Sequence, residues 1–178
     1  RGLGDVYKRQ GIPSIVFGLF GYLFFNIYLK WGYSILGGAL TLSIMVLPLI
    51  LRTTEEALRS VSDTYREGSF GLGAGKLRTV FRIVLPSAVP GILAGVILAI
   101  GRIVGETAAL LYPAGTAPQV ADGLFSSGRT LAVHMYALLN EGLYTEQAYA
   151  TAVVLLVLVV CINALSSFAA KKAGVKEK

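Results

Sequence analysis

The chain has 178 residues, of which 54% are hydrophobic and only 15% are charged. In soluble domains about a quarter of the residues are charged. This composition therefore excludes an ordinary soluble protein and indicates an integral membrane protein. The net charge of +6 comes from Lys and Arg that border apolar segments. A basic groove with interleaved aromatic residues is not indicated, which argues against nucleic-acid binding. The single cysteine, Cys161, lies in an apolar run and predicts neither a disulfide nor a metal cluster.

Residues 1–11 form a polar leader that begins with Arg rather than Met. A secretory signal is not indicated, because the apolar stretch that follows has no small-residue cleavage site and is succeeded by further apolar segments. We expect the chain to be part of a longer reading frame, with some of the leader foreign to the protein. No function is attached to these residues.

Four apolar segments follow, at residues 12–29, 33–51, 86–111 and 147–170. Each has a length near the roughly 20 residues that cross the hydrocarbon of a bilayer. Four buried helices of a soluble protein would need far more polar chain around them than 178 residues offer. The predicted fold is therefore all-α, a polytopic membrane helical bundle with four transmembrane helices.

The basic residues are distributed unevenly among the loops. The loop at 52–82 holds six: Arg52, Arg59, Arg66, Lys76, Arg78 and Arg82. The loop at 112–146, which includes a helix-compatible run at 129–140, holds only Arg129, and the tail at 171–178 holds four. Because cytoplasmic loops are rich in Lys and Arg, we expect the central loop and the C-terminus to face the cytoplasm and the 112–146 loop to face outward.

A polar, basic and glycine-rich stretch separates the second and third apolar segments. Thr64 followed by Glu67 has the form of a capping box and predicts a helix at 65–72. Three glycines then supply positions where the backbone can take positive φ and end the helix: Gly71, Gly73 and Gly75. A second helix is predicted from Lys76 toward Pro86. Such a unit, at the water side of two membrane segments, is suited to docking a partner.

The same glycines do not form a nucleotide-binding loop. A Walker A motif needs a leading Gly and a following Ser or Thr around its Gly-Lys pair, but Phe70 and Leu77 occupy these positions. The dinucleotide fingerprint also fails, because Lys76 stands where the third Gly should be and no buried strand precedes it. Nucleotide binding by this chain itself is therefore not expected.

The stretch resembles the cytoplasmic signature of ABC importer permeases, in which Glu-Ala-Ala, a Gly and a final Ile-x-Leu-Pro recur at fixed spacing. Two small residues replace the two Ala here, so a partner can still approach closely, although Gly68 costs about 1 kcal/mol of helix propensity. The resemblance implies that the ATPase-coupling site comprises Glu67, Gly68, Ser69, Gly73, Ile83, Leu85 and Pro86.

Three further runs narrow the resemblance to permease subunits of bacterial phosphate importers, closest to the PstA type of the MetI-like superfamily. They are IPSIVFGLFG at 12–21, RTTEEAL at 52–58 and GETA at 105–108. The resemblance implies that residues 12–170 are the C-terminal part of a six-helix permease domain whose first two helices are missing. It also implies an ATPase-coupling loop at 52–85 and a basic cytoplasmic tail at 171–178, in a protein of the bacterial inner membrane.

The resemblance further implies an ATP-driven importer of inorganic phosphate, in which this subunit is not an enzyme and needs no cofactor. The implied partners are an ABC ATPase dimer, a second, PstC-like permease, an extracytoplasmic phosphate-binding protein at the outward loop, and membrane lipid, with no nucleic acid. A permease for another oxyanion or solute, such as molybdate or sulfate, is the alternative within this class.

The third apolar segment carries the most informative chemistry. At about 100° per residue, Gly91, Gly95, Arg102 and Glu106 fall within about 60° of one another, so one helix face holds both charges. Charges inside a span usually face a bundle interior or an aqueous path. The resemblance assigns Arg102, Glu106 and Thr107 to the translocation path. The alternatives are an Arg102 to Glu106 pair that only neutralises itself, or charges near the helix end that reach water.

Two Gly-x-x-x-Gly spacings in this segment predict close helix packing: Gly91 with Gly95, and Gly101 with Gly105. An intramembrane enzyme that uses Arg102, Glu106 and His134 is an alternative of a different class, although these residues match no known catalytic motif. Without Cys or a second His nearby, His134 is expected to pack or to lie at an interface rather than to bind a metal.

Overall fold

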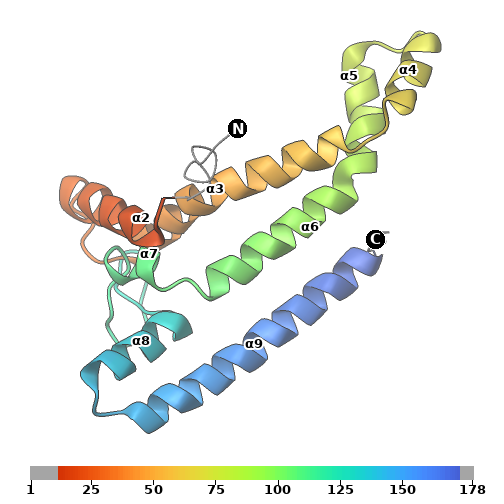
Figure 1. The fold of residues 1–178 in the computed structure, drawn as a ribbon. Coiled ribbons are helices and arrows are strands. Elements are labelled where there is room, and N and C mark those ends of the chain that lie inside the picture. The colour runs from red at the N-terminus through yellow and green to blue at the C-terminus, as the bar shows by residue number, and fades with distance from the viewer. Residues whose placement is uncertain (1–11, 173–178) are drawn as a thin grey trace, which may run out of the picture. The chain divides into compact units, whose positions relative to one another are not determined.

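The computed structural model describes residues 12–172, and this part of the chain is helical without strands, as predicted (Figure 1). The predicted leader and the end of the predicted basic tail lie outside the described residues. In chain order the helices are α2 (Ser14–Gly21), the π-helix η1 (Tyr22–Tyr28), α3 (Ile35–Arg59), α4 (Asp63–Gly71), α5 (Lys76–Thr79), the π-helix η2 (Val80–Val84), α6 (Leu85–Val104), α7 (Ala108–Leu111), α8 (Leu131–Glu141) and α9 (Thr145–Lys172).

Within residues 12–172, three helical stretches are long and apolar enough to cross a membrane: Ile35–Arg59, Lys76–Val104 and Thr145–Phe168. The first predicted span is a shorter apolar helix, Ser14–Tyr28. At about 1.5 Å per residue, this helix is shorter than the roughly 30 Å hydrocarbon core. The structure is thus a membrane helical bundle with three helices of spanning length and one shorter helix.

Two predicted boundaries are wrong. The second span does not end at residue 51, because α3 continues as a polar helix to Arg59. The third span begins earlier and ends earlier than 86–111, since α5, η2 and α6 run on from Lys76 to Val104. After Val104 the chain turns, and the side chain of Glu106 accepts a hydrogen bond from the backbone N–H of Ala109 (3.2 Å), which begins the separate helix α7.

The described chain divides into two units. The first comprises residues 12–45 and 104–155. Within it α2 packs closely on α7, because Gly18 has no side chain and lies directly against the backbone of Ala108 and Ala109. A core of Leu110, Ala114 and Val133 joins α7 and the loop after it to α8.

The second unit comprises residues 46–103 and the part of α9 from residue 156 onward. Its core of Ala57, Val61, Val84 and Ala88 joins the end of α3 to η2 and α6. Gly91 and Gly95 lie directly against Ala57 and Thr53 of α3, so the predicted packing role of this pair is confirmed. Gly105, in contrast, has open space where a side chain would be.

Candidate functional site

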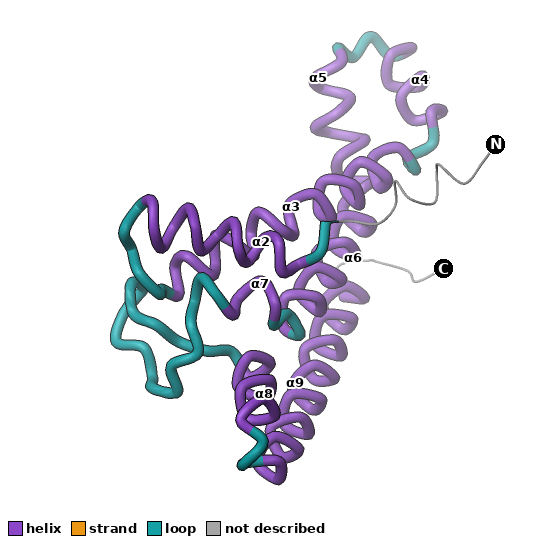
Figure 2. Tube along the Cα trace, turned by 60° about the vertical axis from the view of Figure 1, so that its left-hand side comes forward, coloured by secondary structure: helices purple, strands orange, loops and turns teal. Residues whose placement is uncertain are grey.

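The polar stretch between α3 and α6 forms a helical hairpin, in which a turn joins α4 to α5 (Figure 2). The predicted capping box is wrong, because Ser62 is the N-cap of α4 and its hydroxyl accepts from the N–H of Thr64 at 3.4 Å. Of the three glycines, only Gly73 has a positive φ, 79°. The second helix begins at Lys76 as predicted, but it continues into α6 without a break.

The signature residues are distributed over two sides of this hairpin. Glu67 and Gly68 are exposed on α4, and apart from the backbone of α4 itself nothing in the described chain lies within 4 Å of the position where a Gly68 side chain would begin. Ser69 is buried instead, and its hydroxyl lies 2.9 Å from the hydroxyl of buried Thr79 on α5. Glu67 and Gly68 therefore belong to the surface that a partner can reach, whereas Ser69 holds the hairpin together.

The closing residues of the signature lie where η2 passes into α6. Ile83 and Leu85 are half-buried and Pro86 is exposed. A π-helical turn directly before a proline is a local adjustment by which a helix tolerates the missing N–H. These residues connect the hairpin to the long helix rather than extending the exposed face of α4.

Large apolar side chains are exposed on the hairpin, although its sequence is polar. Leu72 at the turn is 91% exposed and Leu77 on α5 is 76% exposed. Phe70 on α4 is exposed as well, and so is Phe81, which follows in η2. Exposed apolar groups gathered in a polar surface mark interaction sites, so the hairpin is a candidate protein-docking site.

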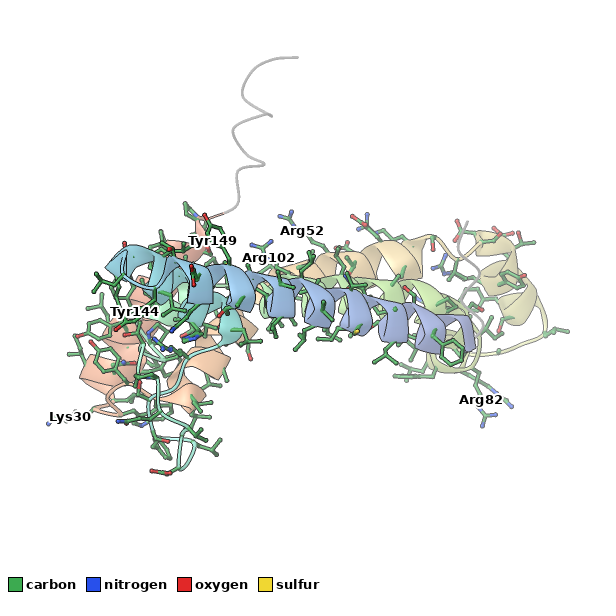
Figure 3. All side chains as sticks on the ribbon, turned by 90° about the horizontal axis from the view of Figure 1, so that it is seen from below. Lys30, Arg52, Arg82, Arg102, Tyr144 and Tyr149 are labelled. Carbon is green, nitrogen blue, oxygen red and sulfur yellow. The ribbon has the colours of Figure 1, made fainter. Side chains whose placement is uncertain are left out.

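Arg102 lines a cavity of about 570 Å³ within the second unit. The other lining residues come from α3, α6 and α9: Leu49, Ala94, Ile97, Leu98, Gly101, Val159 and Asn163. Arg102 and Asn163 are the polar members of an otherwise apolar wall, and both are exposed; Figure 3 labels Arg102 on its helix. A guanidinium stays charged and offers parallel N–H donors to an oxyanion, so this cavity suits an anion.

Asn163 was not among the residues predicted from the sequence. It lies on α9 in the most apolar of the three spans, with its amide oxygen 3.5 Å from the position that a Cβ of Gly101 would take. A lone amide in such a span is itself a signal, because polar groups in membranes are costly and mark functional positions. Asn163 belongs to no recognisable sequence motif, so the sequence pattern did not single it out.

Glu106 and Thr107 are not part of the helix that carries Arg102. Since α6 ends at Val104, the helical spacing that placed Glu106 above Arg102 does not continue that far. Instead Glu106 accepts from the N–H of Ala109, and the carbonyl of Thr107 accepts from Leu110 and Leu111 at 3.1 Å each. Both residues therefore form the turn that starts α7.

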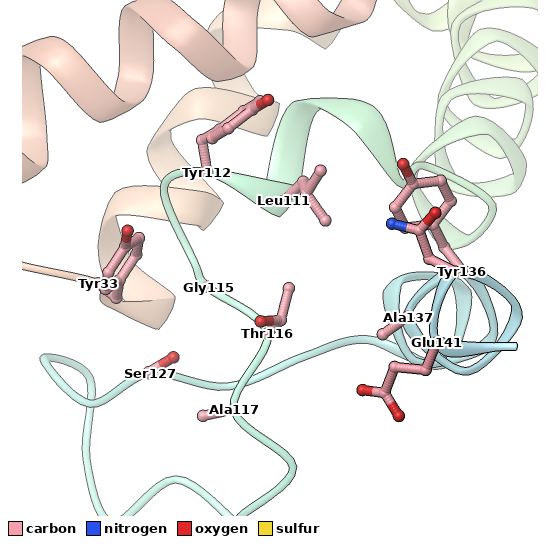
Figure 4. Close-up of a pocket in the computed structure, with 11 residues that line it drawn as sticks. Tyr33, Leu111, Tyr112, Gly115, Thr116, Ala117, Ser127, Tyr136, Ala137 and Glu141 are labelled. Atoms are coloured by element: carbon pink, nitrogen blue, oxygen red, sulfur yellow. The ribbon is translucent and has the colours of Figure 1, made fainter. Parts of the chain in front are cut away.

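The predicted outward loop forms a second cavity, of about 860 Å³, within the first unit. Figure 4 shows Thr116 and Ala117 on the loop, and Tyr136, Ala137 and Glu141 on α8, around the open space. The predicted helix at 129–140 is confirmed as α8, which Thr130 caps by accepting from Val133 at 3.3 Å. The wall is rich in hydroxyl groups and carries a carboxylate, so it suits a polar partner rather than an anion.

Backbone hydrogen bonds fix this loop to the start of α3. The N–H groups of Ser34, Ile35 and Leu36 donate to the carbonyls of Pro113, Ser126 and Leu124 at 2.9–3.0 Å. These donors have no partner inside their own helix, so the loop completes the end of α3. Asn26 adds a side-chain bond, donating to the carbonyl of Pro113 at 3.2 Å.

His134 lies on α8, and its pKa is lowered by partial burial and by the positive charge of Arg129. No group of three or more His, Cys, Asp or Glu that could hold a metal occurs within residues 12–172. Nothing in the described part of the chain thus gives His134 the companions of a metal ligand.

Together these features define a polytopic membrane protein with a helical hairpin that exposes apolar side chains and a basic side chain that lines a cavity among its apolar helices. A family model for the binding-protein-dependent transport system inner membrane component matches residues 9–173. The chain therefore belongs to this family of ABC transport subunits, which are transport components.

Relatives support the same membership. A probable ABC transporter permease protein YqgI from Bacillus subtilis is 41% identical over 150 residues, covering 77% of this chain and 51% of the relative. The phosphate transport system permease protein PstA 2 of Mycobacterium bovis is 46% identical over 106 residues, covering 60% and 35%. PstA of Mycobacterium leprae is 36% identical over 156 residues, covering 86% and 51%. The chain thus spans about half or less of these relatives, and no solved structure matches it.

Proposed function

We propose that this chain belongs to the permease subunit of an ATP-driven importer of inorganic phosphate in a bacterial inner membrane. Several relatives carry the name phosphate transport system permease protein PstA. The observation that carries the proposal within the chain is Arg102, a permanent positive charge that lines a cavity of about 570 Å³ among membrane helices. An anion that leaves water needs such a charge, because unpaired burial costs several kcal/mol.

Glu67, Gly68 and the exposed apolar residues of the hairpin form the proposed contact with an ABC ATPase dimer. Six basic residues lie at 52–82, around this hairpin, whereas the 112–146 loop holds only Arg129. The positive-inside rule therefore favours a cytoplasmic hairpin. ATP would be hydrolysed by the partner. Closure of the ATPase dimer would displace α4 and, through it, the long helices.

Two further partners complete the proposed complex. An extracytoplasmic phosphate-binding protein would dock on the outward loop and α8, where the 860 Å³ cavity presents hydroxyl and carboxylate groups. Only 6% of the most apolar part of the stretch Thr145–Phe168 in α9 is buried within the described chain. This helix therefore has surface available for lipid and for a second permease. The basic tail at 171–178 would lie on the cytoplasmic side of the membrane.

The test is solute-stimulated ATP hydrolysis by the purified complex of both permeases, the ATPase and the binding protein. We expect vanadate-sensitive hydrolysis that rises with phosphate, and rises less with sulfate or molybdate. Stimulation by sulfate or molybdate alone would assign the complex to another oxyanion. Substrate turnover by the permease without an ATPase would contradict the transport class.

A further inference from the structure

Arg66 makes the contacts that join α4 to the end of α3. Its Nη2 donates to the carbonyl of Leu58 at 2.8 Å, and its Nη1 donates to the carbonyl of Val61 at 3.1 Å. Nη1 also pairs with the carboxylate of Asp63. One guanidinium therefore holds the last turn of α3, the linker and the first turn of α4 at once.

The carbonyls that Arg66 binds would otherwise lack helical partners. Helices leave their final C=O groups unsatisfied, and a positive charge there also interacts favourably with the negative end of the helix dipole. Ser60 satisfies two earlier carbonyls of α3, donating through its N–H to Glu56 at 2.9 Å and through its hydroxyl to Ala57 at 2.8 Å. Arg66 completes this set from a different helix, so the end of α3 is closed by a residue of α4.

On its other side α4 is tied to α5 by the buried hydroxyl pair of Ser69 and Thr79. Glu67 and Gly68, which lie between Arg66 and Ser69 in sequence, are exposed on α4. A force applied at the exposed residues therefore reaches α3 through Arg66 and α5 through Ser69. Of these two connections, the Arg66 contacts are the more directional, because a planar fork binds its acceptors in fixed orientations.

We propose that Arg66 is a positioning residue that transmits displacement of α4 to α3 during ATP-driven transport. This inference rests on the proposed function for the existence of an ATPase partner. Lys at this position would keep a positive charge at the end of α3, but its single ammonium lacks the rigid fork that serves both carbonyls. The substitution therefore loosens the transmission without removing the charge.

The experiment compares Arg66→Lys and Arg66→Ala with wild type in reconstituted complexes of the complete subunits. Complex assembly, ATP hydrolysis and phosphate moved per ATP are measured together. We expect normal assembly and basal hydrolysis in Arg66→Lys, with phosphate per ATP lowered about tenfold, the effect of losing a charged hydrogen bond. Arg66→Ala should lower the ratio further.

Arg59→Lys is the matched control. Arg59 is the last residue of α3, the helix whose end Arg66 binds, but its own partner is Glu55, in an ion pair whose side chains are 79% and 60% exposed. Arg59→Lys should leave the phosphate moved per ATP unchanged. An unchanged ratio in Arg66→Lys, beside an active wild type, would overturn the transmission role. Loss of assembly in Arg66→Lys would overturn it too, by making Arg66 a folding residue. A wild-type complex that moves no phosphate with ATP would instead defeat the proposed function, and this inference with it.

Discussion

A phosphate ion that crosses a low-dielectric region loses hydration that must be replaced by fixed charge or hydrogen bonds. Arg102 can provide both from the wall of its cavity. We expect Arg102→Ala to lower phosphate uptake about a hundredfold or more, as for an ion left without a partner. Arg102→Lys should restore it only in part, because a point charge lacks bidentate geometry.

The control for the Arg102→Ala prediction is that the variant complex still assembles and hydrolyses ATP. Assembly and basal ATP hydrolysis should survive in Arg102→Ala, because the residue lies far along the chain from the hairpin at 63–79. Wild-type uptake by Arg102→Ala in proteoliposomes would show that Arg102 serves packing or insertion instead.

Asn163 lines the same cavity from α9 and offers an amide N–H to an anion. Removing one neutral hydrogen bond costs about 1 kcal/mol, so Asn163→Leu should raise the KM for phosphate about fivefold. Asn163→Asp should impair uptake more strongly, since a carboxylate repels the anion. Equal KM values for wild type and both variants in a phosphate uptake assay would remove Asn163 from the path.

For single residues, the predicted position of Glu106 on the helix face of Arg102 is wrong, whereas the roles of Arg102 and Glu67 stay predictions. The angular position of Glu106 assumed that the helix continued, whereas α6 ends at Val104 and Glu106 takes part in the next turn. Helix ends depend on which tertiary contacts satisfy the last backbone groups, and a single sequence does not reveal those. The same reason explains why Ser62, rather than Thr64, caps α4.

At the scale of elements, the contact of α3 with α6 depends on residues that lack side-chain bulk. A Cβ on Gly91 would lie 2.8 Å from the Cβ of Ala57. Gly91→Ala should therefore destabilise the subunit by about 1–3 kcal/mol, the usual cost of overpacking. The measurement is the thermal unfolding midpoint in detergent.

Two companion variants sharpen that prediction. Ala57→Gly should restore much of the stability lost in Gly91→Ala, because it removes the atom that clashes. Gly105→Ala should have a small effect, since nothing lies within 4 Å of its added Cβ. If Gly91→Ala and Gly105→Ala unfolded at the same temperature, the close approach of α3 and α6 would be wrong.

The exposed face of α4 is the element proposed to receive the ATPase. Glu67→Lys reverses the charge on this face without touching the buried Ser69 and Thr79 pair. We expect normal membrane insertion and loss of transport-coupled ATP hydrolysis, measured as stimulation by the loaded binding protein. Stimulation equal to wild type would exclude Glu67 from the docking site.

Element boundaries were predictable only in part, and the reason is physical. Apolar length identifies where a helix crosses hydrocarbon, which located α3, α6 and α9. It does not report where a helix continues into water, so the polar extension of α3 to Arg59 was assigned to a loop. The π-helix η2 likewise leaves no pattern in the sequence, although it makes α5 and α6 continuous.

For the whole molecule, the all-helical membrane fold followed from composition, because a chain that is 54% hydrophobic with 15% charge cannot surround four apolar helices with polar structure. Membership in the family of binding-protein-dependent transport components is consistent with that composition. The transported solute is a property of the assembled complex, and its test must therefore use the assembled complex.

Uptake of radiolabelled phosphate into proteoliposomes tests the central claim most directly. The vesicles would contain the complete permease subunit, its partner permease and the ATPase, with loaded binding protein added on the side of the 112–146 loop. We predict phosphate accumulation that requires ATP, is blocked by vanadate and disappears when this subunit is omitted. Phosphate accumulation that is equal with and without the subunit, or that is absent while another anion accumulates, would contradict the assignment.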